Sequence, residues 1–367
     1  MDKKKILIVF GTRPEAIKMC PLIVELKKRK RFDIIVAVTG QHREMLDQVL
    51  KEFGIFPQYN LSIMKENQSL IEIMSSIMAG MPVILKDEKP DLTLVHGDTL
   101  TAYATAVICY MLNFTVGHVE AGLRTYNMKE PFPEEFNRQS IGMIAKYHFA
   151  PTERAKENLI NEGRGNHIYV TGNTAIDALK YTVKEDYSNP YFEESKGRRL
   201  ILVTLHRREN WNEPMKNVFR ALQRILNENK EQIFALYPIH KNPEIRKIAK
   251  EILGQCENLR MTEPLNTIDF HNIMARSYCI ITDSGGIQEE APYFGKPVLV
   301  ARNVTERPEG VLAGTLKLIG TDEEEVYKSI NELLVNHELY QEMSKAVNPY
   351  GDGTACVKIA DILEMNM

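Results

Sequence analysis

Short apolar runs alternate along the chain with longer segments in which apolar residues recur at helical spacing. The runs of the first half are KILIVF, DIIVAVT, DLTLVHG, FTVGHVE, KYHFAP and HIYVTGN, and those of the second half are LILVTLH, EQIFALYP, SYCIITDSGG and KPVLVA. Strands this continuously apolar, separated by helices, are typical of parallel sheets that helices cover on both faces. Because 367 residues exceed what one hydrophobic core usually serves, we predict two doubly wound α/β domains joined near residues 171–185.

The composition argues against a nucleic-acid-binding, membrane or secreted protein. The 46 Lys and Arg residues nearly balance the 49 Asp and Glu residues, and a net charge of -3 gives no electrostatic footprint for nucleic acid or an anionic membrane. The apolar run at the N-terminus is too short for a signal peptide, and no segment approaches the length of a membrane span. Five cysteines, an odd number without CxxC spacing, lie mostly in apolar runs, as reduced core residues do. We expect a cytoplasmic globular protein.

Polar clusters follow the apolar runs. They are GTRPEAIK, TGQHRE, HGDT, HVEAGLRT, LHRREN, PIHKNP and TDSGGIQEE. Ligands of open α/β sheets collect at the carboxyl ends of the strands, where these clusters fall. If the two sheets face each other, the clusters line one cleft.

The TDSGGIQEE cluster has the pattern of a phosphate site. Gly285 and Gly286 allow the backbone to approach a ligand closely, and the first turn of the following helix offers free N–H groups. Glu290, one turn further on, is placed to accept the hydroxyls of a ribose. The alternative is that Ser284 caps the helix, the glycines serve only the turn and Glu290 is solvated.

GTRPEAIK repeats the strand–turn–helix pattern with two cations. Pro14 suits the first helical position, and Arg13 and Lys18 lie near a helix start that already favours anions. A surface-charged helix start is the alternative. GxGxxG is absent after every strand, which argues against a nicotinamide cofactor.

Three further motifs place carboxylates beyond strands or at a helix start. Asp98 of HGDT is either the cap of the next helix or a carboxylate held for proton transfer. Glu120 closes a buried strand, where either Arg124 neutralises it or it is kept for chemistry. Glu134 and Glu135 follow a proline, and acidic residues there ordinarily complement the helix dipole.

His206 of LHRREN lies among cations past a strand of the second half. One such histidine is no metal site, and HxH and HExxH spacings are absent. Its plausible role is to donate a hydrogen bond to a phosphate or a leaving oxygen. Carboxylates on one side and an anion site on the other suit a nucleoside diphosphate that carries a reactive organic group.

The ordered set of motifs resembles one known family. GTRPEAIK, TGQHREMLDQVL, HGDT, HVEAGLRT, PEEFNR, TGNTAIDAL, LHRREN, SGGIQEE and TERPEG, which span almost the whole chain, look like the non-hydrolysing UDP-N-acetylglucosamine 2-epimerases. The resemblance implies a GT-B architecture, in which two Rossmann-like, doubly wound parallel-sheet domains face a central cleft. It also implies that UDP binds chiefly to the second domain, that the C-terminal helix TACVKIADILEM returns to the first domain, and that the protein is a homodimer. The expected domains are residues 1–172 with 353–367, and residues 173–352.

The resemblance implies an isomerase that interconverts UDP-N-acetylglucosamine and UDP-N-acetylmannosamine without NAD or a metal. UDP is eliminated to a bound 2-acetamidoglucal and added back with inversion at C2, in a pathway that feeds cell-surface polysaccharide. By motif match the catalytic residues are Asp98, Glu120, Glu134 and His206. The UDP contacts by the same match are Arg13, Lys18, Ser284, Gly285, Gly286, Glu290 and Arg307.

Some members of the family also bind a second UDP-N-acetylglucosamine as an activator, and the motif match places Gln41, His42, Arg208 and His240 near that site. Asn67 and Glu44 depart from the pattern associated with it. The alternatives to the main function are a hydrolysing UDP-N-acetylglucosamine 2-epimerase, an epimerase of a modified UDP-sugar, a GT-B glycosyltransferase and a non-catalytic UDP-sugar sensor.

Overall fold

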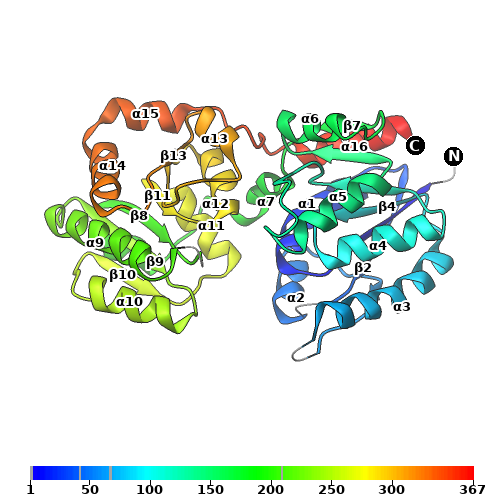
Figure 1. The fold of residues 1–367 in the computed structure, drawn as a ribbon, viewed down its shortest axis with the longest axis horizontal. Helices are drawn as coiled ribbons and strands as arrows, with labels where there is room; N and C mark the ends of the chain where they lie inside the picture. The colour runs from blue at the N-terminus through cyan, green and yellow to red at the C-terminus, as the bar shows by residue number, and fades with distance from the viewer. Residues whose placement is uncertain (1–2, 41–42, 66–67, 208–209) are drawn as a thin grey trace. The chain divides into compact units, whose positions relative to one another are not determined.

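The computed structural model describes residues 3–40, 43–65, 68–207 and 210–367. The chain forms two compact units, Met1–Tyr181 with Tyr350–Met367, and Thr182–Pro349. Each unit is built on one parallel sheet with helices between its strands (Figure 1). These are the two Rossmann-like α/β units of the expected GT-B class.

The first unit has a seven-stranded sheet in the order β3-β2-β1-β4-β5-β6-β7. Its strands are β1 (Lys4–Phe10), β2 (Phe32–Val38), β3 (Tyr59–Asn60), β4 (Leu92–His96), β5 (Val116–Val119), β6 (Tyr147–Ala150) and β7 (Ile168–Val170). Its helices are α1 (Arg13–Lys28), α2 (Arg43–Glu52), α3 (Leu70–Glu88), α4 (Leu100–Met111), α5 (Glu134–Ile144), α6 (Glu153–Asn161), α7 (Thr174–Thr182) and α16 (Ala355–Asn366). Every pairing is parallel.

The side chains of β1 point alternately to the two faces of the sheet, and helices cover both faces. Ile6, Ile8 and Phe10 pack into a core with α1, α2 and α16, whereas Leu7 and Val9 pack on the other side with α3 and α4. Successive residues of a strand point to opposite faces, so a strand buried on both faces needs an unbroken apolar run. KILIVF is such a run.

The second unit has a six-stranded sheet in the order β10-β9-β8-β11-β12-β13. Its strands are β8 (Arg199–Thr204), β9 (Ile233–Pro238), β10 (Leu259–Thr262), β11 (Cys279–Thr282), β12 (Val298–Val300) and β13 (Leu316–Leu318). Its helices are α8 (Pro190–Ser195), α9 (Glu213–Glu228), α10 (Pro243–Leu253), α11 (Thr267–Arg276), α12 (Gly285–Glu290), a 3-10 helix (Ala291–Phe294), α13 (Pro308–Leu312), α14 (Glu323–Val335) and α15 (His337–Lys345).

The C-terminal helix α16 belongs to the first unit, as the resemblance implied. Its apolar side chains join the core beneath α1, and the backbone N–H groups of Ala355 and Cys356 donate to the carboxylate of Asp177 in α7 at 3.1 and 2.9 Å. This contact explains why the units divide after Tyr181 and before Tyr350 rather than at the expected 172/173 and 352/353.

Two segments far apart in the sequence, around Gly172 and Gly351, pack closely against each other in the first unit. A Cβ on Gly172 would lie 3.3 Å from the Cα of Gly351, and both glycines have positive φ, 90° and 129°. The N–H of Asn173 donates to the carbonyl of Tyr350 at 2.7 Å. The segments that leave and re-enter the first unit are therefore joined side by side.

All five cysteines are buried free thiols. Within the described ranges, no helix combines the length and the apolar character needed to cross a bilayer.

Candidate active site

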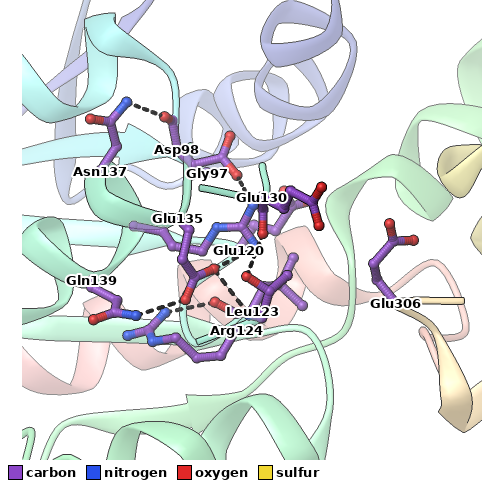
Figure 2. A network of polar contacts seen from close by, with 12 residues as sticks. Gly97, Asp98, Glu120, Leu123, Arg124, Glu130, Glu135, Asn137, Gln139 and Glu306 are labelled. Carbon is purple, nitrogen blue, oxygen red and sulfur yellow. Dashed lines mark hydrogen bonds and ion pairs between the residues drawn. The ribbon is translucent and has the colours of Figure 1, made fainter. Parts of the chain in front are cut away.

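The first unit gathers three carboxylates at one edge of its sheet. Asp98 follows β4 after Gly97, Glu120 follows β5 directly, and Glu134 is the first residue of α5. β4 and β5 are parallel neighbours, so their carboxyl ends meet. Figure 2 shows Asp98 and Glu120 in this region, with the side-chain amide of Asn137 donating to the carbonyl of Asp98 at 2.8 Å.

Glu120 is held in a strained and polar position. Its φ of 62° is left-handed, a conformation that costs a non-glycine residue about 1 kcal/mol or more and that clusters at functional sites. One carboxylate oxygen, Oε2, pairs with the ammonium of Lys18 and accepts from the amide of Asn173 at 3.3 Å. The Nε2 of His96 lies 3.7 Å from the same oxygen.

Of the two interpretations of Glu120, the one in which Arg124 neutralises it is wrong. Arg124 is buried and points to Glu162, with its Nε 2.7 Å and its second terminal nitrogen 2.9 Å from the two carboxylate oxygens. The cation beside Glu120 is Lys18, which α1 supplies. A helix more than a hundred residues away along the chain thus provides the charge that the nearest arginine does not.

Asp98 is a carboxylate with an unusual affinity for protons. Its pKa is raised to about 6: burial is the largest cause, Arg138, whose guanidinium lies 2.7 Å away, opposes the shift, and nearby Glu120 and Glu134 contribute to it. The capping interpretation of Asp98 is wrong, because Thr99 is the cap of α4 and accepts from the third residue of the turn. Asp98 is therefore not committed to the helix.

The two glutamates that begin α5 have different surroundings. Glu135 is fully buried and accepts from the backbone N–H groups of Thr125 and Tyr126 at 3.0 and 3.1 Å, so it ties the loop after β5 to the helix. Glu134 is partly exposed and acts electrostatically on Asp98. The helix-dipole interpretation is therefore incomplete for Glu135, which also organises the loop.

A buried carboxylate also organises the start of α1. Glu15 accepts from the N–H groups of Gly11 and Thr12 at 3.0 and 2.8 Å, which forms a capping box with Thr12. Its other oxygen accepts from the hydroxyl of Thr99 at 2.7 Å. This bond connects the turn that carries Arg13, the first residue of α1, to the turn that carries Asp98.

In the second unit, the SGG turn begins α12 as predicted. Ser284 is the cap residue, and Gly285 and Gly286 are the first two helical residues. A Cβ on Gly285 would lie 2.6 Å from the guanidinium carbon of Arg307, so the glycine allows that cation to lie directly on the turn. Glu289 fixes the same guanidinium through a 2.8 Å ion pair.

Glu290, the last residue of α12, lies 3.6 Å from the Nε2 of buried His271. The other ring nitrogen of His271 is hydrogen-bonded to the hydroxyl of Thr182 at 2.8 Å. The carboxylate expected to hold a ribose is therefore partly buried rather than solvated.

His206 is positioned by Asp283, a fully buried residue that the sequence analysis did not select. The carboxylate of Asp283 accepts from the N–H groups of His206 and Arg207 and lies 3.2 Å from the Nδ1 of His206. Burial lowers the pKa of His206, and the Asp283 carboxylate opposes that shift. The ring stacks on His240 with centroids 5.8 Å apart.

A pocket opens beside His206 at the carboxyl end of the second sheet. It is lined by Thr204, Leu205, His206, Pro238, His240, Pro264, Leu265, Phe270 and Ile287. Phe270 and Leu265 were also missed by sequence analysis. Neither follows a predicted strand, and an apolar residue that lines a pocket has the same pattern as one that lines the core.

Three residues assigned to a second nucleotide site, Gln41, His42 and Arg208, lie outside the described residues, as does Asn67. His240, the fourth, lines the pocket above. Among the described side chains, no group of three or more His, Cys, Asp and Glu residues is arranged to hold a metal ion.

Comparison with known proteins identifies the family. The family model for UDP-N-acetylglucosamine 2-epimerase matches residues 24–364. The Bacillus subtilis UDP-N-acetylglucosamine 2-epimerase is 54% identical over 364 residues, which cover 99% of this chain and 96% of the relative. Among solved structures, S. aureus MnaA in complex with UDP has a TM-score of 0.90 at 48% identity, covering 98% and 96% of the two chains. The Neisseria meningitidis UDP-GlcNAc 2-epimerase bound to UDP-GlcNAc has a TM-score of 0.89 at 43% identity, covering 99% and 100%. The chain belongs to the UDP-N-acetylglucosamine 2-epimerase family.

Proposed function

We propose that the protein interconverts UDP-N-acetylglucosamine and UDP-N-acetylmannosamine by eliminating UDP to 2-acetamidoglucal and adding it back, with no hydrolysis of the intermediate. The observation that carries the proposal is the group of carboxylates at the carboxyl edge of the first sheet. One of them, Asp98, has a pKa of about 6, so it accepts and returns a proton near neutral pH. Catalytic groups are tuned toward the working pH in this way.

The reaction needs this arrangement because the C2 proton of the sugar has no adjacent carbonyl to acidify it. Departure of the diphosphate builds positive charge on the ring, and an ordinary carboxylate then removes the neighbouring proton. Asp98, Glu120 and Glu134 share the acid and base duties on the two faces of the sugar. Donors around the leaving diphosphate stabilise it by about 3 kcal/mol each where they are preorganised.

We assign the uridine diphosphate to the second unit. The pocket beside Phe270 and Leu265 offers an apolar face to a flat base, and the N–H groups of the SGG turn, with Arg307 lying on Gly285, suit a phosphate. Glu290, which lies beside His271, suits the ribose hydroxyls. The bound UDP-GlcNAc of the Neisseria meningitidis relative supports this class of ligand.

The other members of the UDP set have consistent chemistry. Asp283 holds the Nδ1 of His206, which leaves Nε2 for a phosphate oxygen when the ring is protonated. Arg13 and Lys18, on the first turns of α1, are two further cations whose chemistry suits a diphosphate.

We also propose that the protein works as a homodimer in the cytoplasm. Exposed apolar side chains lie on three neighbouring helices of the first unit, α3, α4 and α5: Val83, Tyr110, Met111, Phe136 and Met143. An apolar patch of this kind on a globular protein marks an interaction surface. A second copy of the chain would cover it.

The test is to incubate the protein with UDP-N-acetylglucosamine in heavy water and to follow proton NMR. Epimerisation with deuterium at C2 supports the proposal. Release of free N-acetylmannosamine would show a hydrolase, and UDP release only with an added sugar acceptor would show a glycosyltransferase. Binding without any change would show a sensor.

A further inference from the structure

One buried polar atom beside Glu120 is unsatisfied. His96, the last residue of β4, is 3% exposed, and its Nε2 finds no hydrogen-bond partner among the described residues. A buried polar atom left without a partner costs about 1–3 kcal/mol. Such an exception in a folded protein calls for an explanation, and this one lies 3.7 Å from the Oε2 of Glu120.

His96 is a neutral group at this position. Its pKa is lowered to about 4: burial is the main cause, Glu120 opposes the shift, and Lys18 contributes to it. At neutral pH the imidazole beside Glu120 is therefore uncharged rather than a second cation, and it can donate an N–H from one of its ring nitrogens.

The Oε2 of Glu120 is already engaged by Lys18 and by the amide of Asn173. An ammonium stabilises the ionised form of a carboxylate, so the ion pair with Lys18 and the amide of Asn173 hold this oxygen in place. Lys18 comes from α1, whose first turn also carries Arg13, and a diphosphate brings negative charges that compete for both cations.

We propose that His96 is the positioning residue that holds Glu120 after the substrate's diphosphate has drawn Lys18 away. The inference rests on the proposed function. A movement of less than about 1 Å brings Nε2–H to hydrogen-bonding distance of Oε2. The left-handed backbone of Glu120 stays fixed. Its carboxylate loses the ammonium of Lys18 and accepts a hydrogen bond from the neutral imidazole of His96 instead. Glu120 thus keeps its orientation when substrate is bound, without a cation on its carboxylate.

Two substitutions at His96 separate this role from a structural one. His96→Leu removes the donor, and His96→Gln places an amide N–H near the position of Nε2. We expect His96→Leu to lower turnover at least tenfold while UDP binds within twofold of wild type. Its melting temperature should be unchanged or higher, because an apolar group replaces an unsatisfied polar one. His96→Gln should recover most of the turnover.

The proposal would be overturned if His96→Leu kept half of the wild-type turnover, or if His96→Gln were as impaired as His96→Leu. A structural role predicts that turnover, UDP affinity and melting temperature fall together, and that pattern would also overturn it.

A spectroscopic readout does not depend on turnover. In protein labelled with ¹⁵N-histidine, the Nε2–H signal of His96, assigned by its absence in His96→Leu, should move downfield when UDP is added. In Lys18→Met the signal should lie downfield without UDP, since the cation is already gone. A signal that UDP leaves unmoved contradicts the inference. If the signal moves but wild-type protein does not epimerise, the inference stands and the proposed reaction fails.

Discussion

Replacement of Asp98 by asparagine should make the stability of the protein less dependent on pH. The pKa of Asp98 is about 6 in the folded chain against an ordinary value of 3.8. Between those values the folded state keeps a proton that the unfolded state has released, so stability falls as the pH rises. A shift of about two units corresponds to about 3 kcal/mol. The asparagine side chain carries no such proton, and the advantage of Asp98→Asn over wild type should therefore grow by about 3 kcal/mol from pH 4 to pH 7 and then level off.

Urea unfolding at pH 4, 5, 6, 7 and 8, followed by far-ultraviolet circular dichroism, measures this difference. Tryptophan fluorescence is the wrong probe, because the single tryptophan, Trp211, lies in the second unit. Asp98→Ser is the matched control: it is also uncharged, so its curve should run parallel to that of Asp98→Asn with a constant offset. The reasoning is refuted if the difference between Asp98→Asn and wild type is the same at pH 4 and pH 7. It is also refuted if wild type gains on the variant, because the ion pair with Arg138 would then outweigh burial.

Four further outcomes are expected. Glu120→Gln should abolish turnover while calorimetry still detects UDP binding, and near-normal activity would exclude a catalytic role. Glu135→Ala should lower the free energy of unfolding by about 3 kcal/mol in urea titrations, because buried donors lose their acceptor; a loss under about 1 kcal/mol would contradict this. Phe270→Ala should weaken UDP binding about tenfold, as loss of one aromatic face under a base does, whereas unchanged affinity would place the base elsewhere. Met111→Lys combined with Met143→Lys should shift the protein from dimer to monomer in light scattering, and an unchanged mass would place the interface on another surface.

The sheet cores were predictable from sequence because central parallel strands are buried on both faces. All ten predicted runs are strands, including KILIVF as β1 and SYCIIT as β11. The three strands that were missed, Tyr59–Asn60, Leu259–Thr262 and Leu316–Leu318, are all at sheet edges. An edge strand has one hydrogen-bonded neighbour and here spans only two to four residues, so it leaves little pattern.

The candidate site was predictable in its residue types and not in its pairings. The rule that ligands collect at the carboxyl ends of strands selected Asp98, Glu120 and His206. It gave no information on which cation would reach Glu120, since Lys18 comes from another helix, whereas the adjacent Arg124 turns to Glu162. A buried residue such as Asp283 leaves the same sequence signal as any polar residue after a strand.

The return of α16 to the first unit has a consequence for synthesis of the chain. Ile23 and Leu26 of α1 share a core with Ile359 and Leu363, which are translated only after the second unit. The first unit therefore cannot complete its core until the whole second unit and α16 have been translated, and until then part of its apolar surface stays exposed. A product truncated after residue 349 would retain a complete second unit and an unfinished first one, and it should be prone to aggregation and proteolysis.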